Sequence, residues 1–347
     1  MSSTSRGKNT VRDRAEDPFR STQAAYAAKR HLVDRLTMKE VSAELGISRF
    51  TAARLVDWAR ANGIVRIEIS NRTNTDFMLS AALERAYGLR RALVVAGLDG
   101  PSDSVRDAVA EVAAAGLAAL ISPTDIVGIS WGRVLDSIVD QLPPLRARQV
   151  VQLVGGMASL ESATSGVDLV RRLALRTGAE GLALIAPLIV TTSAAAESLR
   201  HDPMIAKTLR TIDSVTIAIA GIGSWEPPSS RLMDTFERSE ADAFLKRGVV
   251  ADVCGLMIAT DGTLLSPDGI DARRIGVLPT QLENMPTVVA VAGGREKHSA
   301  ITAVLRSRMV NVLITDAGAA QHALKSAGAD GYTGVGTIGR ASVPASG

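Results

Sequence analysis

The chain has 347 residues, of which 46% are hydrophobic, and it carries a net charge of +3 at neutral pH. This length predicts two or three domains with a sizeable hydrophobic core. No run of about 20 apolar residues occurs, so the sequence predicts no membrane span. Cys254 is the single cysteine. It excludes a disulfide framework within the chain and favours a cytoplasmic protein.

Metal and cofactor motifs are missing from the sequence. The four histidines, His31, His201, His298 and His322, form no pair with metal-ligand spacing. There is no G-x-G-x-x-G after the first predicted strand and no G-x-x-x-x-G-K-[ST], so dinucleotide and nucleoside-triphosphate sites are not expected. We therefore predict no metal and no cofactor.

Positive charge is concentrated near the N-terminus. Residues 1–70 contain 13 Lys or Arg and 8 Asp or Glu, whereas residues 71–347 contain 26 and 28. A basic patch supplies the attraction to phosphates on which non-specific DNA binding depends. Residues 1–20 are rich in Ser, Arg and Asp and lack apolar periodicity, so they are expected to be a disordered tail and not a signal peptide.

The most informative segment is a helix-turn-helix pattern over residues 38–55. A first helix is predicted over residues 21–36, and the pattern follows it. Gly46 lies where the chain reverses and can take the positive φ of a tight turn. The Ser48 hydroxyl can cap the second helix, which is expected to end at residues 62–63.

The outer face of this second helix is basic and bears hydroxyl groups, which suits the major groove of DNA. The alternative is an ordinary helical hairpin with a solvated face. The DNA reading predicts contacts by five residues: Ser48, Arg49, Phe50, Thr51 and Arg54.

The chain beyond this helix predicts a short strand, a linker and a large domain. Residues 64–69 alternate apolar with charged side chains, as a strand or wing would. Residues 71–76 are polar and turn-prone. The predicted organisation is a tail at 1–20, a DNA-binding domain at 21–70, a linker at 71–76 and a large domain at 77–347.

The large domain is predicted to be α/β. Apolar runs of strand length alternate with alanine-rich amphipathic helices. Strands that are apolar throughout are buried on both faces, which is typical of a parallel, doubly wound, Rossmann-like sheet. The predicted strands are 92–96, 125–129, 150–154, 182–186, 215–220, 288–292 and 312–315.

Glycines and hydroxyl residues follow several of these strands, where doubly wound sheets bind ligands. After the strand at 125–129 the chain opens a helix, whose free N–H groups, with Ser130 and Arg133, can hold a phosphate or another anion. Each such glycine can also be a matter of turn geometry alone. The glycine-bearing loops are 128–133, 155–156, 221–224 and 293–297.

Taken together, these motifs resemble the SorC/DeoR-type sugar-binding transcriptional regulators over about residues 20–330. The motifs that carry the resemblance are Ile47-Ser48-Arg49, 63–67, 128–133, 151–156, 186–187, 202–203, 221–224, 253–255 and 292–297.

The resemblance implies a winged helix-turn-helix domain and an effector domain similar to sugar-phosphate isomerases and deaminases. Such a protein would be a tetramer, built as a pair of dimers, that binds operator DNA under the control of a sugar, polyol or sugar phosphate. By matching motif, the effector pocket would be lined by Ser130, Trp131, Gly132, Arg133, Gly155, Gly156, Gly221, Gly223, Ser224, Asp252, Gly293, Gly294 and Lys297.

The sequence departs from the family pattern at a few positions. Ala52 and Ala53 stand where a β-branched and a polar residue are common, and Asp252 lacks the usual preceding glycine. Catalysis is not expected. Two alternatives remain: an active sugar-phosphate isomerase or deaminase with an accessory DNA-binding domain, and a constitutive DNA-binding protein whose large domain only oligomerises. An enzyme would need a general base, for which the available carboxylates are Asp99, Asp125, Asp252 and Glu296.

Overall fold

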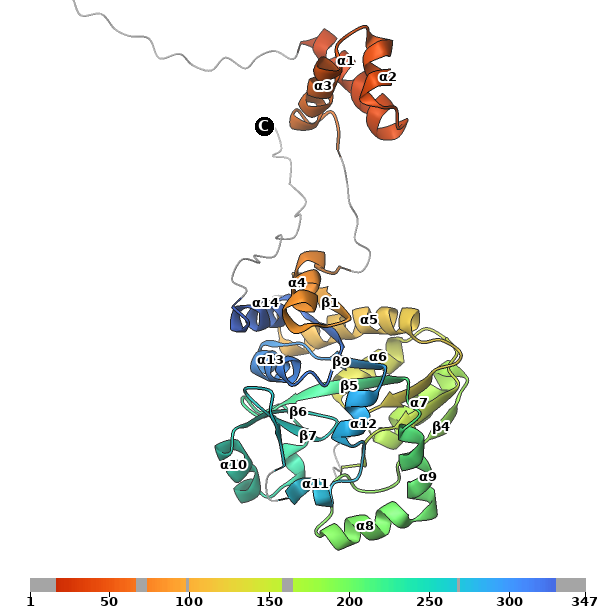
Figure 1. The fold of residues 1–347 in the computed structure, drawn as a ribbon, viewed down its shortest axis with the longest axis vertical. Coiled ribbons are helices and arrows are strands. Elements are labelled where there is room, and N and C mark those ends of the chain that lie inside the picture. The colour runs from red at the N-terminus through yellow and green to blue at the C-terminus, as the bar shows by residue number, and fades with distance from the viewer. Residues whose placement is uncertain (1–16, 67–73, 98–99, 158–164, 267–268, 329–347) are drawn as a thin grey trace, which may run out of the picture. The chain divides into compact units, whose positions relative to one another are not determined.

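The computed structural model describes residues 17–66, 74–97, 100–157, 165–266 and 269–328. The chain divides into two compact units, Met1–Asn71 and Arg72–Gly347 (Figure 1). Each unit has a hydrophobic core of its own. Of the predicted tail and linker, residues 1–16 and 71–73 lie outside the described residues.

The first helix of the N-terminal unit, α1 (Pro18–Ala28), begins within the segment predicted as a tail. It does so because the Asp17 carboxylate accepts hydrogen bonds from the backbone N–H groups of Phe19 and Arg20. The helix runs on into a π-helical turn, η1 (Lys29–Val33).

Two further helices, α2 (Met38–Leu45) and α3 (Arg49–Ala61), form the predicted helix-turn-helix. Thr37 and Glu40 make a reciprocal capping box at the start of α2. Gly46 ends this helix with a φ of +64°, which glycine adopts at little cost. The Ser48 hydroxyl accepts the N–H of Thr51 at the start of α3. These local signals confirm the helix-turn-helix prediction.

Alanine, valine and leucine side chains form most of the core of this unit. Ala24, Val41 and Val56 are buried in it. Ala52 is also fully buried, so the small residue at this position packs inside the unit. The predicted wing is not seen as a strand in residues 64–66, and residues 67–69 lie outside the described part of the chain.

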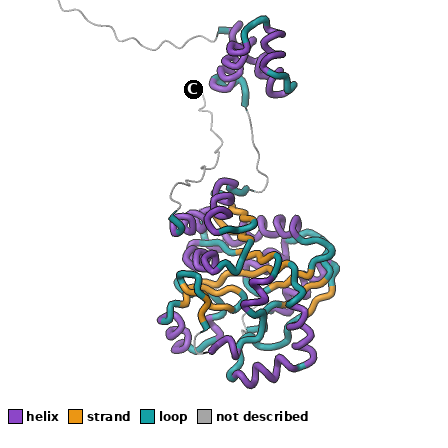
Figure 2. Tube along the Cα trace, viewed as in Figure 1, coloured by secondary structure: helices purple, strands orange, loops and turns teal. Residues whose placement is uncertain are grey.

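The larger unit is built on a parallel sheet in the order β1-β10-β9-β5-β2-β3-β4, which confirms the doubly wound prediction. Figure 2 shows these strands in orange between layers of purple helices. Their bounds are β1 (Arg91–Val95), β2 (Ile126–Ile129), β3 (Gln149–Gln152), β4 (Glu180–Leu182), β5 (Ile217–Ser224), β9 (Thr287–Val291) and β10 (Val312–Asp316).

Helices cover both faces of the sheet because successive strand residues point to opposite sides. Val94 packs in the core on one face and Val95 in the core on the other. The first face is covered by α4 (Phe77–Tyr87), α13 (His298–Ser307) and α14 (Ala317–Ser326). The opposite face is covered by α5 (Ser102–Leu120), α6 (Arg133–Gln141) and α7 (Gly166–Thr177).

Two parts of this unit differ from the strand prediction. The run 182–186 is a loop beyond Leu182, because the Leu184 N–H donates to the Gln152 side chain (3.1 Å) in place of a neighbouring strand. Three antiparallel strands that the sequence did not predict extend from β5. They are β6 (Val249–Val253), β7 (Leu256–Ala259) and β8 (Leu264–Leu265).

Several of the remaining helices add to the core on the first face, to which Ile212 of α9 and Leu282 of α12 belong. The region of α8 and α9 has a small core around Leu184, Ala196 and Ile275. The helices are α8 (Ser193–His201), α9 (Pro203–Ile212), α10 (Arg238–Lys246), α11 (Ile270–Arg273) and α12 (Pro279–Asn284), with 3₁₀ turns η2 (Met233–Thr235) and η4 (Arg295–Lys297).

The order of strands reverses between β2 and β5. From β2 the chain moves outward through β3 to β4, whereas from β5 it moves the other way through β9 to β10. In open α/β sheets, ligands bind in the crevice at the carboxyl ends of the strands at such a reversal. The fold therefore places the candidate ligand site beyond the ends of β2 and β5.

Candidate functional site

The recognition helix α3 presents its predicted DNA-binding residues to solvent. Ser48, Arg49, Phe50, Thr51 and Arg54 are all exposed. The Ser48 hydroxyl already accepts the Thr51 N–H at 3.1 Å, so its first role is to cap the helix. The other four side chains form a basic, partly apolar face at the N-terminal end of α3, the end that reads base edges in helix-turn-helix proteins.

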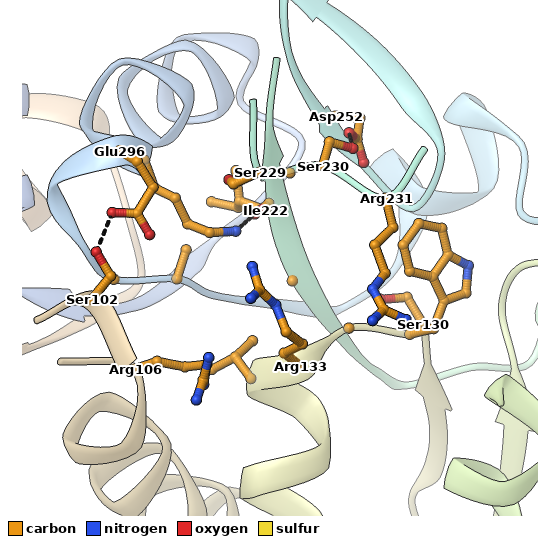
Figure 3. A pocket seen from close by; sticks show the side chains of 18 of the residues that line it. Ser102, Arg106, Ser130, Arg133, Ile222, Ser229, Ser230, Arg231, Asp252 and Glu296 are labelled. Atoms are coloured by element: carbon orange, nitrogen blue, oxygen red, sulfur yellow. Dashed lines mark hydrogen bonds between the residues drawn. The ribbon is translucent and has the colours of Figure 1, made fainter. Parts of the chain in front are cut away.

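The second site is a cavity of about 130 Å³ beyond β2 and β5 (Figure 3). Its position is the one that the strand reversal predicts. Predicted effector residues that line it are Ser130, Trp131, Gly132, Arg133, Gly221, Gly223, Asp252, Gly293 and Lys297.

Helix N-termini converge on this cavity. Residues from the first turns of α5 and α6 and from η4, which leads into α13, contribute to its lining. Neither Pro101 before α5 nor Gly132 before α6 supplies a side-chain cap. The first N–H groups of a helix have no partner inside the helix and carry partial positive charge. The cavity is therefore suited to an anionic group.

Cationic side chains add to this field. Figure 3 shows Arg106, Arg133 and Arg231 entering the cavity from α5, from the start of α6 and from the loop after β5. Arg106 pairs with Asp103 at 2.6 Å. Arg133 makes no ion pair with any described residue. Its guanidinium is thus available to a ligand.

Lys297 lies on the side of the cavity formed by η4. Its ammonium group donates to the carbonyl of Ile222, and the two remaining protons can serve a ligand. Burial lowers the pKa of Lys297, whereas the nearby carboxylate of Asp252 opposes this shift. Glu296 accepts a hydrogen bond from Ser102 at 2.6 Å.

Asp252 is held by its own neighbours. Its Oδ1 accepts hydrogen bonds from the indole N–H of Trp225 (3.0 Å) and from the hydroxyl of Ser230. Burial raises its pKa. Gly223 pairs with it across β5 and β6, and a Cβ at Gly223 would lie 2.3 Å from Oδ1. Asp252 therefore anchors the loop that carries Arg231 to the cavity.

Three buried polar atoms of cavity-lining residues make no hydrogen bond within the described part of the chain, although the Arg106 Nε lies 3.5 Å from a carboxylate oxygen of Asp107 in an ion pair. The Arg106 Nε, Trp131 Nε1 and Ser229 Oγ atoms are buried and make no hydrogen bond to any described residue. Buried polar groups in proteins are almost always hydrogen-bonded. These donors are suited to the hydroxyl and phosphoryl oxygens of a bound sugar.

Four predicted effector residues do not line the cavity: Gly155, Gly156, Ser224 and Gly294. A Cβ at Gly155 would lie 2.7 Å from backbone atoms of Pro187 and Leu188, so glycine there allows two chain segments to approach closely. The Ser224 carbonyl accepts the N–H groups of Ser229 and Ser230, and the Gly294 N–H donates to Asp316 at 2.9 Å. The contacts of Gly155, Ser224 and Gly294 are therefore with other parts of the chain.

Twelve of the described residues that line the cavity were not among the effector residues predicted from the sequence. They are Ser102, Asp103, Arg106, Val134, Ile222, Ser229, Ser230, Arg231, Cys254, Gly255, Ala292 and Glu296. Arg106 lies one turn into α5, a helix whose start the sequence analysis did not locate. Burial raises the pKa of the Cys254 thiol to about 12, which keeps it neutral.

Among the described residues, no group of three or more His, Cys, Asp or Glu side chains is placed to hold a metal ion. Asp99, one of the carboxylates considered as a base, lies outside the described residues. None of the described helices is both long and apolar enough to cross a membrane.

A helix-turn-helix unit followed by a doubly wound domain defines a transcriptional regulator with two units. The family model described as "Putative sugar-binding domain" matches residues 71–325. The chain belongs to the SorC/DeoR-type sugar-binding transcriptional regulators. The resemblance in the sequence and the predicted fold class are therefore confirmed.

Relatives support this membership over most of the chain. The sorbitol operon regulator of Klebsiella pneumoniae is 31% identical, over 84% of this chain and 93% of the relative. The deoxyribonucleoside regulator of Bacillus subtilis is 26% identical, over 84% and 93%. The crystal structure of the full-length regulator SorC from Klebsiella pneumoniae matches with a TM-score of 0.65 and 26% identity, over 86% of this chain and 97% of that one.

Proposed function

We propose that the chain binds operator DNA through Ser48, Arg49, Phe50, Thr51 and Arg54, and that a sugar phosphate in the cavity controls this binding. The observation that carries the proposal is the convergence of the α5, α6 and η4 starts with Arg106, Arg133, Arg231 and Lys297. A phosphate group is the natural ligand of a helix N-terminus with arginine beside it.

The charge of the cavity favours a phosphorylated sugar over a free sugar or polyol. Three lining carboxylates are engaged: Asp103 by Arg106, Asp252 by Trp225 and Ser230, and Glu296 by Ser102. The Arg133 guanidinium makes no ion pair with a described residue, so its positive charge can attract a ligand. An anionic ligand can pair with this exposed guanidinium without breaking an ion pair between described residues of the protein.

Effector binding is proposed to act by a population shift. The ligand stabilises one arrangement of subunits in a homo-tetramer, and this arrangement sets the spacing of paired recognition helices. The two half-sites of an operator lie one helical turn of DNA, about 34 Å, or a multiple of this distance apart. Analytical ultracentrifugation with and without the effector measures the assembly, and a monomer under both conditions would contradict this part.

We infer a regulator and not an enzyme. An isomerase or deaminase needs a general base that takes a proton from the substrate, and the carboxylates are the candidates considered for this role. The cavity carboxylates Asp252 and Glu296 already accept hydrogen bonds from protein groups. Turnover of a panel of sugar phosphates, followed by NMR, would overturn this inference.

The experiment that tests the proposed effector compares matched pairs of free and phosphorylated pentoses, hexoses and polyols by thermal shift. A sugar phosphate at 100 times its Kd should add about 2.7 kcal/mol of stability, whereas its unphosphorylated partner should add little at the same concentration. The same compound should change the affinity for operator DNA. Equal shifts from both members of each pair would refute the preference for phosphate.

Arg49→Ala tests the recognition helix. Arg49 is exposed in the first turn of α3, so its loss should not disturb folding. We expect specific affinity to fall by about 1–3 kcal/mol while binding to unrelated DNA changes much less. Arg60→Ala, an exposed change in the last turn of α3, is the matched control. An equal loss on specific and unrelated DNA would make Arg49 a phosphate contact.

A further inference from the structure

Phe50 is a large apolar side chain that the recognition helix presents to solvent. It is the second residue of α3, and 73% of its surface is exposed. It does not belong to the hydrophobic core formed by the described residues of its unit. A large exposed apolar side chain costs free energy in water unless a partner covers it. Its position on the recognition helix makes DNA the partner to consider.

The residues around the Phe50 ring also favour DNA as its partner. The Arg54 guanidinium carbon lies 5.9 Å from the centre of the Phe50 ring, within the range of a cation–π contact. Arg49 and Thr51 flank the ring in sequence and are exposed. Phe50 is thus an apolar patch set among cationic and hydroxyl groups that are complementary to DNA.

We propose that Phe50 selects a thymine in each operator half-site by packing against its C5-methyl group in the major groove. This methyl is the apolar group in the major-groove pattern of the four base pairs, and phenylalanine is among the side chains that contact it. Arg54, held over the ring, limits the orientations that the ring can adopt. The inference rests on the proposed DNA binding and adds to it the base that is read.

The test uses the full-length protein and duplex DNA selected by it from a random pool. Each thymine of the selected sequence is replaced in turn by deoxyuridine, which removes the methyl group alone. At one position in each half-site, the wild-type protein should bind the uracil duplex roughly fourfold more weakly, as expected for loss of one buried methyl group. Phe50→Ala should bind the thymine and uracil duplexes equally.

Phe19 provides a matched control in the same unit. It is also exposed, at 84%, but lies on α1. Phe19→Ala should therefore keep the wild-type preference for thymine. The replacement of thymine by uracil is measured with the wild-type protein, so a folding defect of a variant cannot produce a difference between the two duplexes.

Three outcomes would overturn the inference. In the first, the wild type binds the thymine and uracil duplexes equally at every position. In the second, Phe50→Ala still prefers thymine. In both cases the proposed DNA binding still holds, because a sequence has been selected from the pool. If no sequence is enriched from the pool, the proposed DNA binding fails and the role of Phe50 fails with it.

Discussion

Arg133→Ala is expected to weaken the binding of a sugar phosphate by roughly 10- to 100-fold, the effect of removing a hydrogen bond to a charged group. Arg133 stands at the N-terminus of α6, lines the cavity and makes no ion pair with any described residue. Its removal therefore leaves no buried carboxylate without a partner. Isothermal titration calorimetry with the sugar phosphate that gives the largest thermal shift measures the change.

The control for Arg133 separates the local contact from the general charge of the protein. Arg146 is an exposed arginine of the same unit that does not line the cavity. Arg146→Ala should leave the affinity for the sugar phosphate within about twofold, because exposed charges interact weakly at distance in salt. An unchanged affinity in Arg133→Ala would remove this residue from the effector site.

Gly155→Ala is expected to destabilise the larger unit by about 1–3 kcal/mol, as overpacking does. The added Cβ would lie 2.7 Å from the Leu188 nitrogen and from two backbone atoms of Pro187. Backbone atoms cannot rotate away as the end of a side chain can. Because the buried indole of Trp225 reports on this unit, urea unfolding followed by tryptophan fluorescence measures the loss.

Gly156→Ala is the neighbouring control. A Cβ there would approach no closer than 3.9 Å to the Ala186 oxygen, so stability should change little. Both variants should retain their affinity for the effector once folded, since neither glycine lines the cavity. A loss of effector affinity in Gly155→Ala without a loss of stability would restore the sequence reading of Gly155 as an effector contact.

The sequence predicted the glycine loops of the cavity because a loop after a buried strand has a recognisable composition. Gly132, Gly221 and Gly293 were found in this way and do line the cavity. Gly155 has the same signature in the sequence and serves a different purpose, close packing against Pro187 and Leu188. Composition alone does not distinguish these two roles.

The antiparallel strands were missed for a different reason. The segments of β6 and β7, on either side of Cys254 and Gly255, are apolar apart from Asp252. These two residues take φ values of +51° and +71°, which is the backbone of a two-residue hairpin turn. A residue followed by glycine between two apolar runs was the signal available in the sequence.

What the sequence by itself determined is local. The Thr37–Glu40 capping box, Gly46 and the Ser48 cap act between residues a few positions apart, so their pattern alone defines the helix-turn-helix. The alternation of apolar strands with helices likewise defined the doubly wound class. The caps and the turn depend on contacts that are close in the chain, and the sheet class follows from the local alternation of apolar strands with amphipathic helices.

Only the tertiary structure decided which side chains share the cavity. Arg106 and Lys297 are almost 200 residues apart in the sequence, and both line it. Asp252 meets Ser230 and Trp225 because β6 pairs with β5. The order of strands brings these groups together. That order is set by the packing of helices against both faces of the sheet, which involves residues far apart in the chain. A contact between residues so far apart produces no repeating pattern of residue types in the sequence.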